Sequence, residues 1–196
     1  MRLSESVGGR RWRMLPAALA ACAAAWGQST PIDPAHSTMT VHVFKAGMLS
    51  ALGHDHEIAA PVAGGSIDAG ARKVELRVDA SALRVVDAKA SDKDRSEIQA
   101  NMLGPEVLDT QNFKEIRFRS ARAEQAAPGG WTVAGDLTLH GQTRPVSVRV
   151  REKEGRYSGS SKLKITDFGI KPVKVAGGTV RVKDEVQIDF DIQVAR

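Results

Sequence analysis

Hydrophobic and polar residues alternate along most of the chain after residue 27. The clearest alternation covers residues 186–194, where every second residue is Val, Ile or Phe and the residues between them are Gln or Asp. A period of two predicts strands that bury one face and expose the other. Related patterns predict further strands at 38–44, 64–68, 74–78, 116–119, 131–139, 146–151, 156–166 and 179–183.

One segment has the pattern of a helix instead. Ser91 or Asp92 can cap its start, Ile98 and Met102 lie four residues apart on one face, and the pair at 104–105 is Gly-Pro, which ends helices. One helix of about three turns cannot cover a sheet of seven or eight strands. The sheet must therefore cover itself, and we predict an all-β, antiparallel β-barrel of about eight strands with one short helix, in preference to a sandwich.

The interior of such a barrel is predicted to be apolar. A barrel of about eight strands is either filled by its own side chains or leaves room for one small ligand, and alternation alone does not decide between a packed core and a cavity. An apolar cavity would accept an aliphatic chain and few polar molecules. The side chains expected to line it are Val41, Val43, Leu76, Phe118, Leu137, Leu139, Val148, Ile188 and Phe190.

The first 27 residues have the pattern of an export signal. A head with four arginines precedes an Ala/Leu-rich stretch at 14–26, and Ala25-Trp26-Gly27 offers small residues where signal peptidase cleaves. We therefore predict a signal peptide at 1–27, a single barrel domain at 28–196, and a periplasmic or secreted protein. An alternative is a lipoprotein signal, because Leu19-Ala20-Ala21-Cys22 resembles a lipobox that would anchor the chain through Cys22.

Charge and cysteine content exclude several classes of function. Without residues 1–27, Lys plus Arg falls from 28 to 24 and Asp plus Glu from 23 to 22, so the net charge falls from +5 to +2. No basic tract remains that would follow a nucleic-acid backbone. No apolar run reaches the roughly 18–20 residues of a transmembrane helix. Cys22 is the only cysteine, so disulfides, thiol catalysis and cysteine-based zinc sites are not expected in 28–196.

Catalytic constellations are also missing from the sequence. There is no nucleophile elbow, phosphate-binding loop or dinucleotide fingerprint, and the paired carboxylates at 189 and 191 fall on an outward strand face. We therefore expect no enzyme and no cofactor. A weak metal hypothesis rests on His54 and His56, which two residues apart would point the same way, with His42 as the third candidate ligand. The other interpretations of this pair are a polar loop at the barrel rim and a contact to a ligand's head group, for which Lys45 and Arg144 are further candidates.

Several segments resemble one known family in their order along the chain. They are the opening segment 32–37 (IDPAHS), the middle segment 108–120 (LDTQNFKEIRFRS), the segment 135–146 (GDLTLHGQTRPV), which is specific, and the late segment 167–170 (DFGI). Together they resemble the YceI-like, polyisoprenoid-binding family over essentially all of 30–196. The resemblance implies a secreted or periplasmic, lipocalin-like barrel that holds an extended apolar lipid.

The chain departs from the family pattern at one mouth of the expected barrel. Lys45 stands where the family tends to have a histidine after its first strand, and residues 53–57 (GHDHE) replace an apolar, glycine-containing run. The sequence therefore predicts an exported protein that binds a polyprenyl, quinone or fatty-acyl lipid, with head-group contacts of its own. The alternatives are a periplasmic metal-binding module and a solid barrel with a protective or interaction role, and a homodimer is left open.

Overall fold

The described part of the chain folds almost entirely into β-structure. In this computed structural model it comprises residues 29–46, 55–175 and 180–195. These residues form eleven strands, one α-helix and two 3-10 helices, which confirms the predicted all-β class. The strands are β1 (Thr30–Ala46), β2 (His56–Ala59), β3 (Val62–Asp68), β4 (Lys73–Asp79), β5 (Arg84–Val85), β6 (Glu115–Ala127), β7 (Gly130–Leu139), β8 (Gln142–Lys153), β9 (Arg156–Lys164), β10 (Lys174–Val175) and β11 (Val180–Val194).

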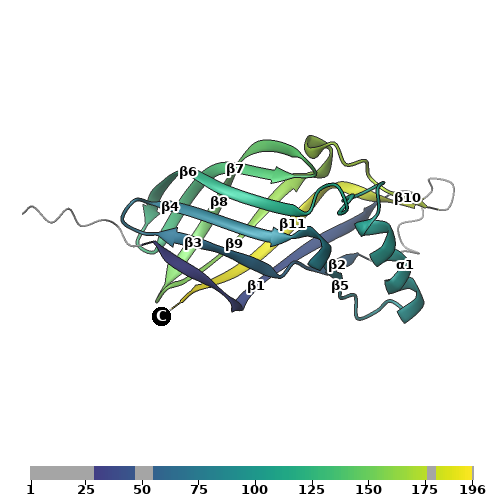
Figure 1. Cartoon of the computed structure of the whole chain (residues 1–196), viewed down its shortest axis with the longest axis horizontal. Coiled ribbons are helices and arrows are strands. Elements are labelled where there is room, and N and C mark those ends of the chain that lie inside the picture. The colour runs from purple at the N-terminus through teal and green to yellow at the C-terminus, as the bar shows by residue number, and fades with distance from the viewer. Residues whose placement is uncertain (1–28, 47–54, 176–179, 196) are drawn as a thin grey trace, which may run out of the picture.

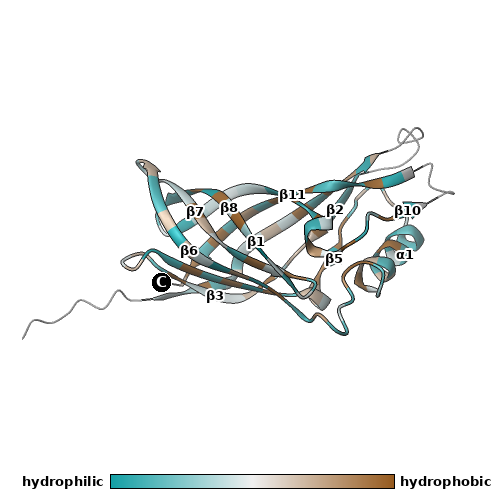
Figure 2. Ribbon diagram, turned by 90° about the horizontal axis from the view of Figure 1, so that it is seen from above, coloured by the Kyte–Doolittle hydropathy of each residue, from teal (hydrophilic) through white to brown (hydrophobic). Residues whose placement is uncertain are grey.

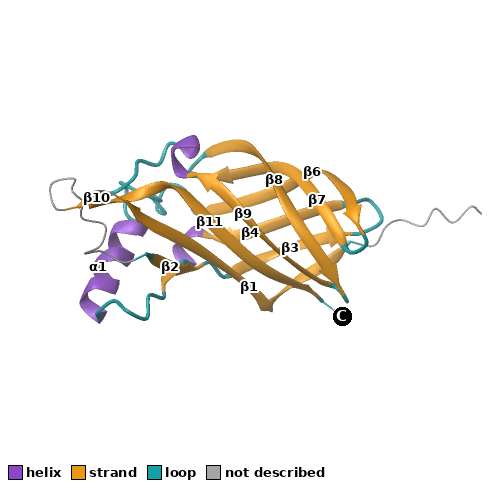
Figure 3. Ribbon diagram, turned by 180° about the vertical axis from the view of Figure 1, so that it is seen from behind, coloured by secondary structure: helices purple, strands orange, loops and turns teal. Residues whose placement is uncertain are grey.

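The long strands close into an antiparallel barrel (Figures 1 and 3). Their order is β11-β9-β8-β7-β6-β4-β3-β1, and β1 pairs again with β11, so the ring contains eight strands of at least seven residues. β2, β5 and β10 have two to four residues each and extend the sheet beside β1 and β11. Eleven strands are present instead of about eight because alternation cannot reveal strands of two to four residues.

Several predicted strand boundaries differ from the observed ones. The two strands predicted near the C-terminus merge from residue 180 onward into one strand, β11. The segment predicted as strand 156–166 ends at Lys164, where the 3-10 helix η3 (Ile165–Phe168) begins. Along the ring strands, hydrophobic residues alternate with hydrophilic ones, as Figure 2 shows.

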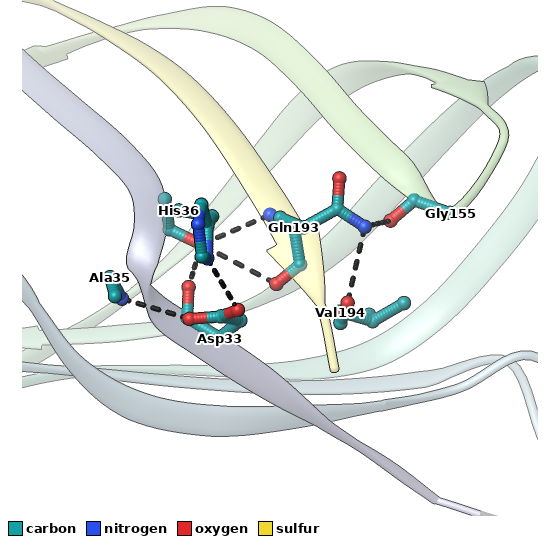
Figure 4. A network of polar contacts seen from close by, with 7 residues as sticks. Asp33, Ala35, His36, Gly155, Gln193 and Val194 are labelled. Carbon is teal, nitrogen blue, oxygen red and sulfur yellow. Dashed lines mark hydrogen bonds and ion pairs between the residues drawn. The ribbon is translucent and has the colours of Figure 1, made fainter. Parts of the chain in front are cut away.

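The first strand begins eight residues earlier than predicted, because it contains an irregularity. Asp33 pairs with Gln193, but the next pairing of β1 with β11 is at residue 38, so residues 34–37 bulge out of the ladder. A polar network holds this bulge (Figure 4): the Asp33 carboxylate lies 2.7 Å from His36 Nδ1, and the Ser37 hydroxyl donates to the Asp33 carbonyl at 2.6 Å. Ser37 Oγ also accepts from the Gln193 amide at 3.0 Å, which ties the bulge to β11.

The β7–β8 hairpin shows how local sequence sets the edge of a strand. His140 and Gly141 form a two-residue turn with φ angles of 49° and 70°, the conformation of a type I′ hairpin. Hydrogen-bonded and non-hydrogen-bonded pairs alternate away from this turn, and Pro145 forms a non-hydrogen-bonded pair with Asp136 of β7. Its nitrogen, which carries no hydrogen, therefore points away from β7, and no hydrogen bond of the β7–β8 ladder is lost. β8 pairs with β9 only over residues 149–153, and η3 contacts β8 beyond that point.

The helix has the predicted bounds. α1 (Asp92–Leu103) starts after Ser91, whose hydroxyl accepts from the Asp94 amide at 3.1 Å, and Gly104 caps its end. α1 lies at one end of the barrel, opposite the end that holds the C-terminus (Figure 1). Met102 is buried on its inner side. Within the described residues, no helix is long and apolar enough to span a bilayer.

Candidate ligand-binding cavity

A cavity of about 900 Å³ runs through the barrel. Its wall consists mainly of Val, Leu, Ile and Phe side chains from the ring strands, and charged side chains lie at its two ends. Lys45 and Arg181 line the end beside α1, whereas Ala69 and Arg72 of the β3–β4 turn line the opposite end. Pockets for one small ligand have volumes of roughly 300–1,000 Å³. The interior of this barrel therefore has room for one lipid-sized molecule.

The structure places all nine predicted lumen residues on the wall of this cavity. They are Val41, Val43, Leu76, Phe118, Leu137, Leu139, Val148, Ile188 and Phe190. Eight of them are only partly buried although they point into the barrel, because they border the open space of the cavity. Leu139 differs, since its exposed fraction is 9% and it packs in a buried cluster. Their contact with a ligand remains a prediction.

Two packed clusters flank the cavity. The larger one gathers residues of β2, β5, η3 and α1 around Phe168, which is 1% exposed, and it includes Met102 and Leu139. The smaller one joins β1, β3 and β11 through Ile32, Val62, Ile67 and Ile192. These clusters supply the packed core that the sequence required, and they leave the space between them open. The barrel is therefore not solid, which was one of the alternatives.

At the α1 end, the predicted rim residues Lys45 and His56 line the cavity. His54 lies outside the described residues. The Nδ1 atom of His56 is 2.5 Å from the Asp87 carboxylate, and the Asp87 side chain is 3% exposed. Asp87 was not found from the sequence, because it lies 31 residues further along the chain and no motif links the two positions. Only the packing of the segment after β5 against β2 brings them together.

At the opposite end, an aromatic pair marks the limit of the cavity. Trp131 and Tyr157 both line it, and the Arg72 guanidinium lies 5.8 Å from the centre of the Trp131 ring, a cation–π distance. Burial raises the pKa of the Tyr157 hydroxyl, and the negative charge of Glu152 raises it further. The Tyr157 hydroxyl is therefore neutral, and this end offers rings and one hydroxyl to the end of an apolar chain.

The structure separates His42 from His56, two of the three histidines of the metal hypothesis. His42 pairs with Glu57 and the neighbouring Val43 pairs with His56, so His42 and His56 lie on opposite faces of the β1–β2 ladder. His42 is on the outer face, where its Nε2 is 3.0 Å from the Asp189 carboxylate. Among the described residues, no three His, Cys, Asp or Glu side chains gather as a metal site. His42 and His56 therefore cannot share one ion.

Hydrogen bonds keep the pKa of the Asp189 carboxyl below its ordinary value. Ser160 and Gln187 make the largest contributions, and the nearby His42 adds a smaller one. Asp189 is consequently ionised when it meets His42, and the contact joins β1 to β11 on the outside of the barrel. This cluster is structural and does not reach the cavity.

Two residues of the specific segment are not part of the cavity wall. Arg144 lies opposite the lumen residue Leu137, but it is exposed on β8, donates to the Thr143 carbonyl at 2.9 Å and does not line the cavity, so its contact with a head group stays a prediction. In the turn of the same segment, the Thr138 and Thr143 hydroxyls bond each other at 2.9 Å, and His140 Nδ1 lies 3.2 Å from the Phe168 carbonyl. His140 thus fixes η3 onto the β7–β8 hairpin.

Comparison with protein families gives one match across nearly all of the described chain. A model of the YceI-like domain matches residues 31–194. A UPF0312 protein of Vibrio cholerae is 25% identical over 114 residues, which are 53% of this chain and 59% of that protein. A UPF0312 protein of Shewanella baltica is 25% identical over 149 residues, or 71% of this chain and 74% of that protein. The match with the Vibrio protein thus spans less than two thirds of its length.

Solved structures show the same fold. Burkholderia cenocepacia BcnA superposes with a TM-score of 0.63 at 20% identity, over 84% of this chain and 99% of that one. The Campylobacter jejuni YCEI protein superposes with a TM-score of 0.50 at 11% identity, over 78% of this chain and 84% of that one. At these identities the likeness is one of fold.

Proposed function

The chain belongs to the YceI-like family, known as polyisoprenoid-binding barrel proteins, and from this premise we propose that it binds one amphiphilic lipid inside its barrel. The ligand is a molecule with a long apolar tail of the polyprenyl, quinone or fatty-acyl type. The tail lies along the cavity, and a small polar head lies at a charged end. The protein holds or carries this lipid and performs no chemistry on it.

The observation that supports the proposal is the cavity of about 900 Å³ with its apolar wall. Each buried methylene group stabilises a bound tail by roughly 0.8 kcal/mol before the cost of ordering the chain. The middle of the cavity offers mainly hydrocarbon surface, so the tail and not the head should supply most of the affinity. A longer tail should therefore bind more tightly until the cavity is full.

The family is periplasmic, and we propose the same location for this chain. Residues 1–27 would then act as a signal peptide and 28–196 as the lipid-binding barrel. Residues 1–27 lie outside the described residues, so the support for this step is their composition: a basic head, an apolar stretch and a small-residue cleavage site.

Titration with prenyl chains of increasing length tests the proposal. Geraniol, farnesol and geranylgeraniol, together with their methyl ethers, are added to the exported protein, and the fluorescence of Trp131 reports binding. Trp131 lines the cavity and is the only tryptophan in 28–196. We expect affinity to rise by roughly tenfold or more with each prenyl unit. Equal affinity along both series would contradict lipid binding in the cavity.

Organic extraction of protein purified natively from the periplasm provides an independent check. Mass spectrometry should find about one amphiphilic lipid per chain. A protein that carries neither lipid nor measurable affinity for prenyl chains would match the alternative of a protective or interaction barrel.

A further inference from the structure

His56 and Asp87 form a polar pair beside a cavity whose wall is mainly apolar, and an apolar ligand tail does not require such a pair. Asp87 is one of the two buried polar or charged residues of the described chain, and burying a carboxylate is costly unless its oxygens are satisfied. Oδ2 lies 2.5 Å from Nδ1 of His56, and Oδ1 accepts from the Glu57 amide at 2.5 Å. The carboxylate therefore has a partner for each oxygen, and one partner is a side chain on the cavity wall.

The segment that carries Asp87 is fixed to the barrel on both sides. The Val86 amide donates to the Glu57 carbonyl at 2.8 Å, which continues the contact of this segment with β2. From α1, one guanidinium nitrogen of Arg95 donates to the carbonyls of Asp87 and Ala90 at 3.0 and 2.8 Å. Asp87 consequently holds the imidazole of His56 in one orientation.

This orientation decides what the other ring nitrogen can do. An ionised Asp87 accepts from the Glu57 amide and can only accept from His56, so the proton of the neutral imidazole lies on Nδ1. Nε2 then carries a lone pair and is a hydrogen-bond acceptor. It has no partner among the described residues, and His56 lines the cavity, so this lone pair is available to a molecule inside the barrel.

We propose that Nε2 of His56 accepts a hydrogen bond from a hydroxyl group on the head of the bound lipid, which selects an alcohol or phenol over an ether or ester of the same tail. The inference rests on the proposed lipid-binding function and specifies the head group that this end of the cavity takes. Asp87 acts as a positioning residue, because it sets the tautomer and does not itself reach the ligand.

Charged side chains of both signs surround this end of the cavity. Three bases line it, Lys45, Lys171 and Arg181, together with the carboxylates of Asp94 and Glu97 on α1. A head group here therefore meets donors and acceptors of both signs, and a neutral group that forms hydrogen bonds can be accommodated. A hydroxyl that donates one hydrogen bond to Nε2 fits this environment.

The test compares two ligands that differ in one donor. Geranylgeraniol and its methyl ether share the same tail, but only the alcohol can donate to Nε2. Dissociation constants of both are measured for the wild type, for His56→Leu, for Asp87→Asn, and for the control His36→Leu, which alters an exposed histidine in the bulge of β1. The thermal midpoint of each variant shows whether it is folded.

We expect the wild type and His36→Leu to bind the alcohol roughly three- to tenfold more tightly than the ether, the effect of one net hydrogen bond. In His56→Leu the ratio should fall to about one while the dependence on tail length persists. In Asp87→Asn the amide donates to Nδ1, the imidazole proton moves to Nε2, and the ratio should fall to one or below, since Nε2 then donates to the ether oxygen.

Equal binding of alcohol and ether by the wild type, with the tail-length dependence intact, overturns this inference alone, and this measurement needs no variant. A wild-type ratio retained in folded His56→Leu or Asp87→Asn also overturns it. Absence of binding for every chain length overturns the proposed function, and this inference with it.

Discussion

Two aliphatic residues that both point into the barrel have different surroundings. They are Val148 on β8 and Leu139 on the adjacent strand β7. Val148 keeps accessible surface because it faces the open part of the cavity, whereas Leu139 packs in the cluster around Phe168. Alternation assigns both residues to the interior. Only their neighbours determine which one borders space that a ligand could fill.

This difference predicts opposite results for two tryptophan substitutions. In Val148→Trp the indole enters empty space, so the free energy of unfolding should change by less than about 1 kcal/mol while prenyl ligands bind at least tenfold more weakly. In Leu139→Trp the indole overpacks a buried cluster, and the free energy of unfolding should fall by about 1–3 kcal/mol. Urea denaturation and ligand titration measure both quantities. Equal destabilisation by the two substitutions would mean that the cavity is closed at Val148.

At the scale of elements, short polar signals set the ends of strands and of the helix. The His140-Gly141 turn fixes the β7–β8 hairpin, and Pro145 leaves part of β8 without a donor toward β9. Ser91 and Gly104 define the bounds of α1, which lies at the end of the barrel where His56 lines the cavity. These signals are local, and they place the elements around the α1 end of the cavity.

The N-cap of α1 gives a prediction at this scale. Ser91→Ala removes the hydroxyl that accepts from the Asp94 amide, and loss of such a cap costs about 1 kcal/mol of stability. Ser96→Ala is the matched control, because the Ser96 hydroxyl only donates back to the Asp92 carbonyl within an exposed part of the same helix. Thermal unfolding should show a lower midpoint for Ser91→Ala and an unchanged or higher midpoint for Ser96→Ala. Equal midpoints for the two variants would show that the cap does not stabilise the fold.

At the scale of the whole molecule, the ring of eight strands closes and encloses one apolar space. β1 closes the ring. It pairs along most of its length with β11, and its first residues, Thr30 and Pro31, pair with β3. The charged outer faces and the apolar interior result from the same alternation, read on the two sides of one sheet. An amphiphilic ligand can therefore bury its tail in a protein whose exterior is hydrophilic.

The predicted leader gives a test for the whole chain. If signal peptidase cleaves after Gly27, the exported protein begins at Gln28, and its intact mass should equal that of residues 28–196. Cleavage before Cys22 with lipid attached to its sulfur would add the mass of residues 22–27 and of the acyl groups. The second result would contradict plain cleavage and would indicate membrane anchoring, while leaving the barrel unchanged.

The sequence alone determined the features that depend on neighbouring residues. Alternation with a period of two predicted the strands and their inward faces, the Ser91 and Gly104 signals predicted the helix, and ordered segments identified the family. Only the tertiary structure decided the features that depend on distant contacts. It showed that β1 continues through the bulge tied to Gln193, that the interior is open between two packed clusters, and that Asp87 lies against His56. The reason is physical: a strand's period is set by its own backbone, whereas empty volume and a hydrogen bond across 31 residues depend on how the strands pair and where the connecting segments pack.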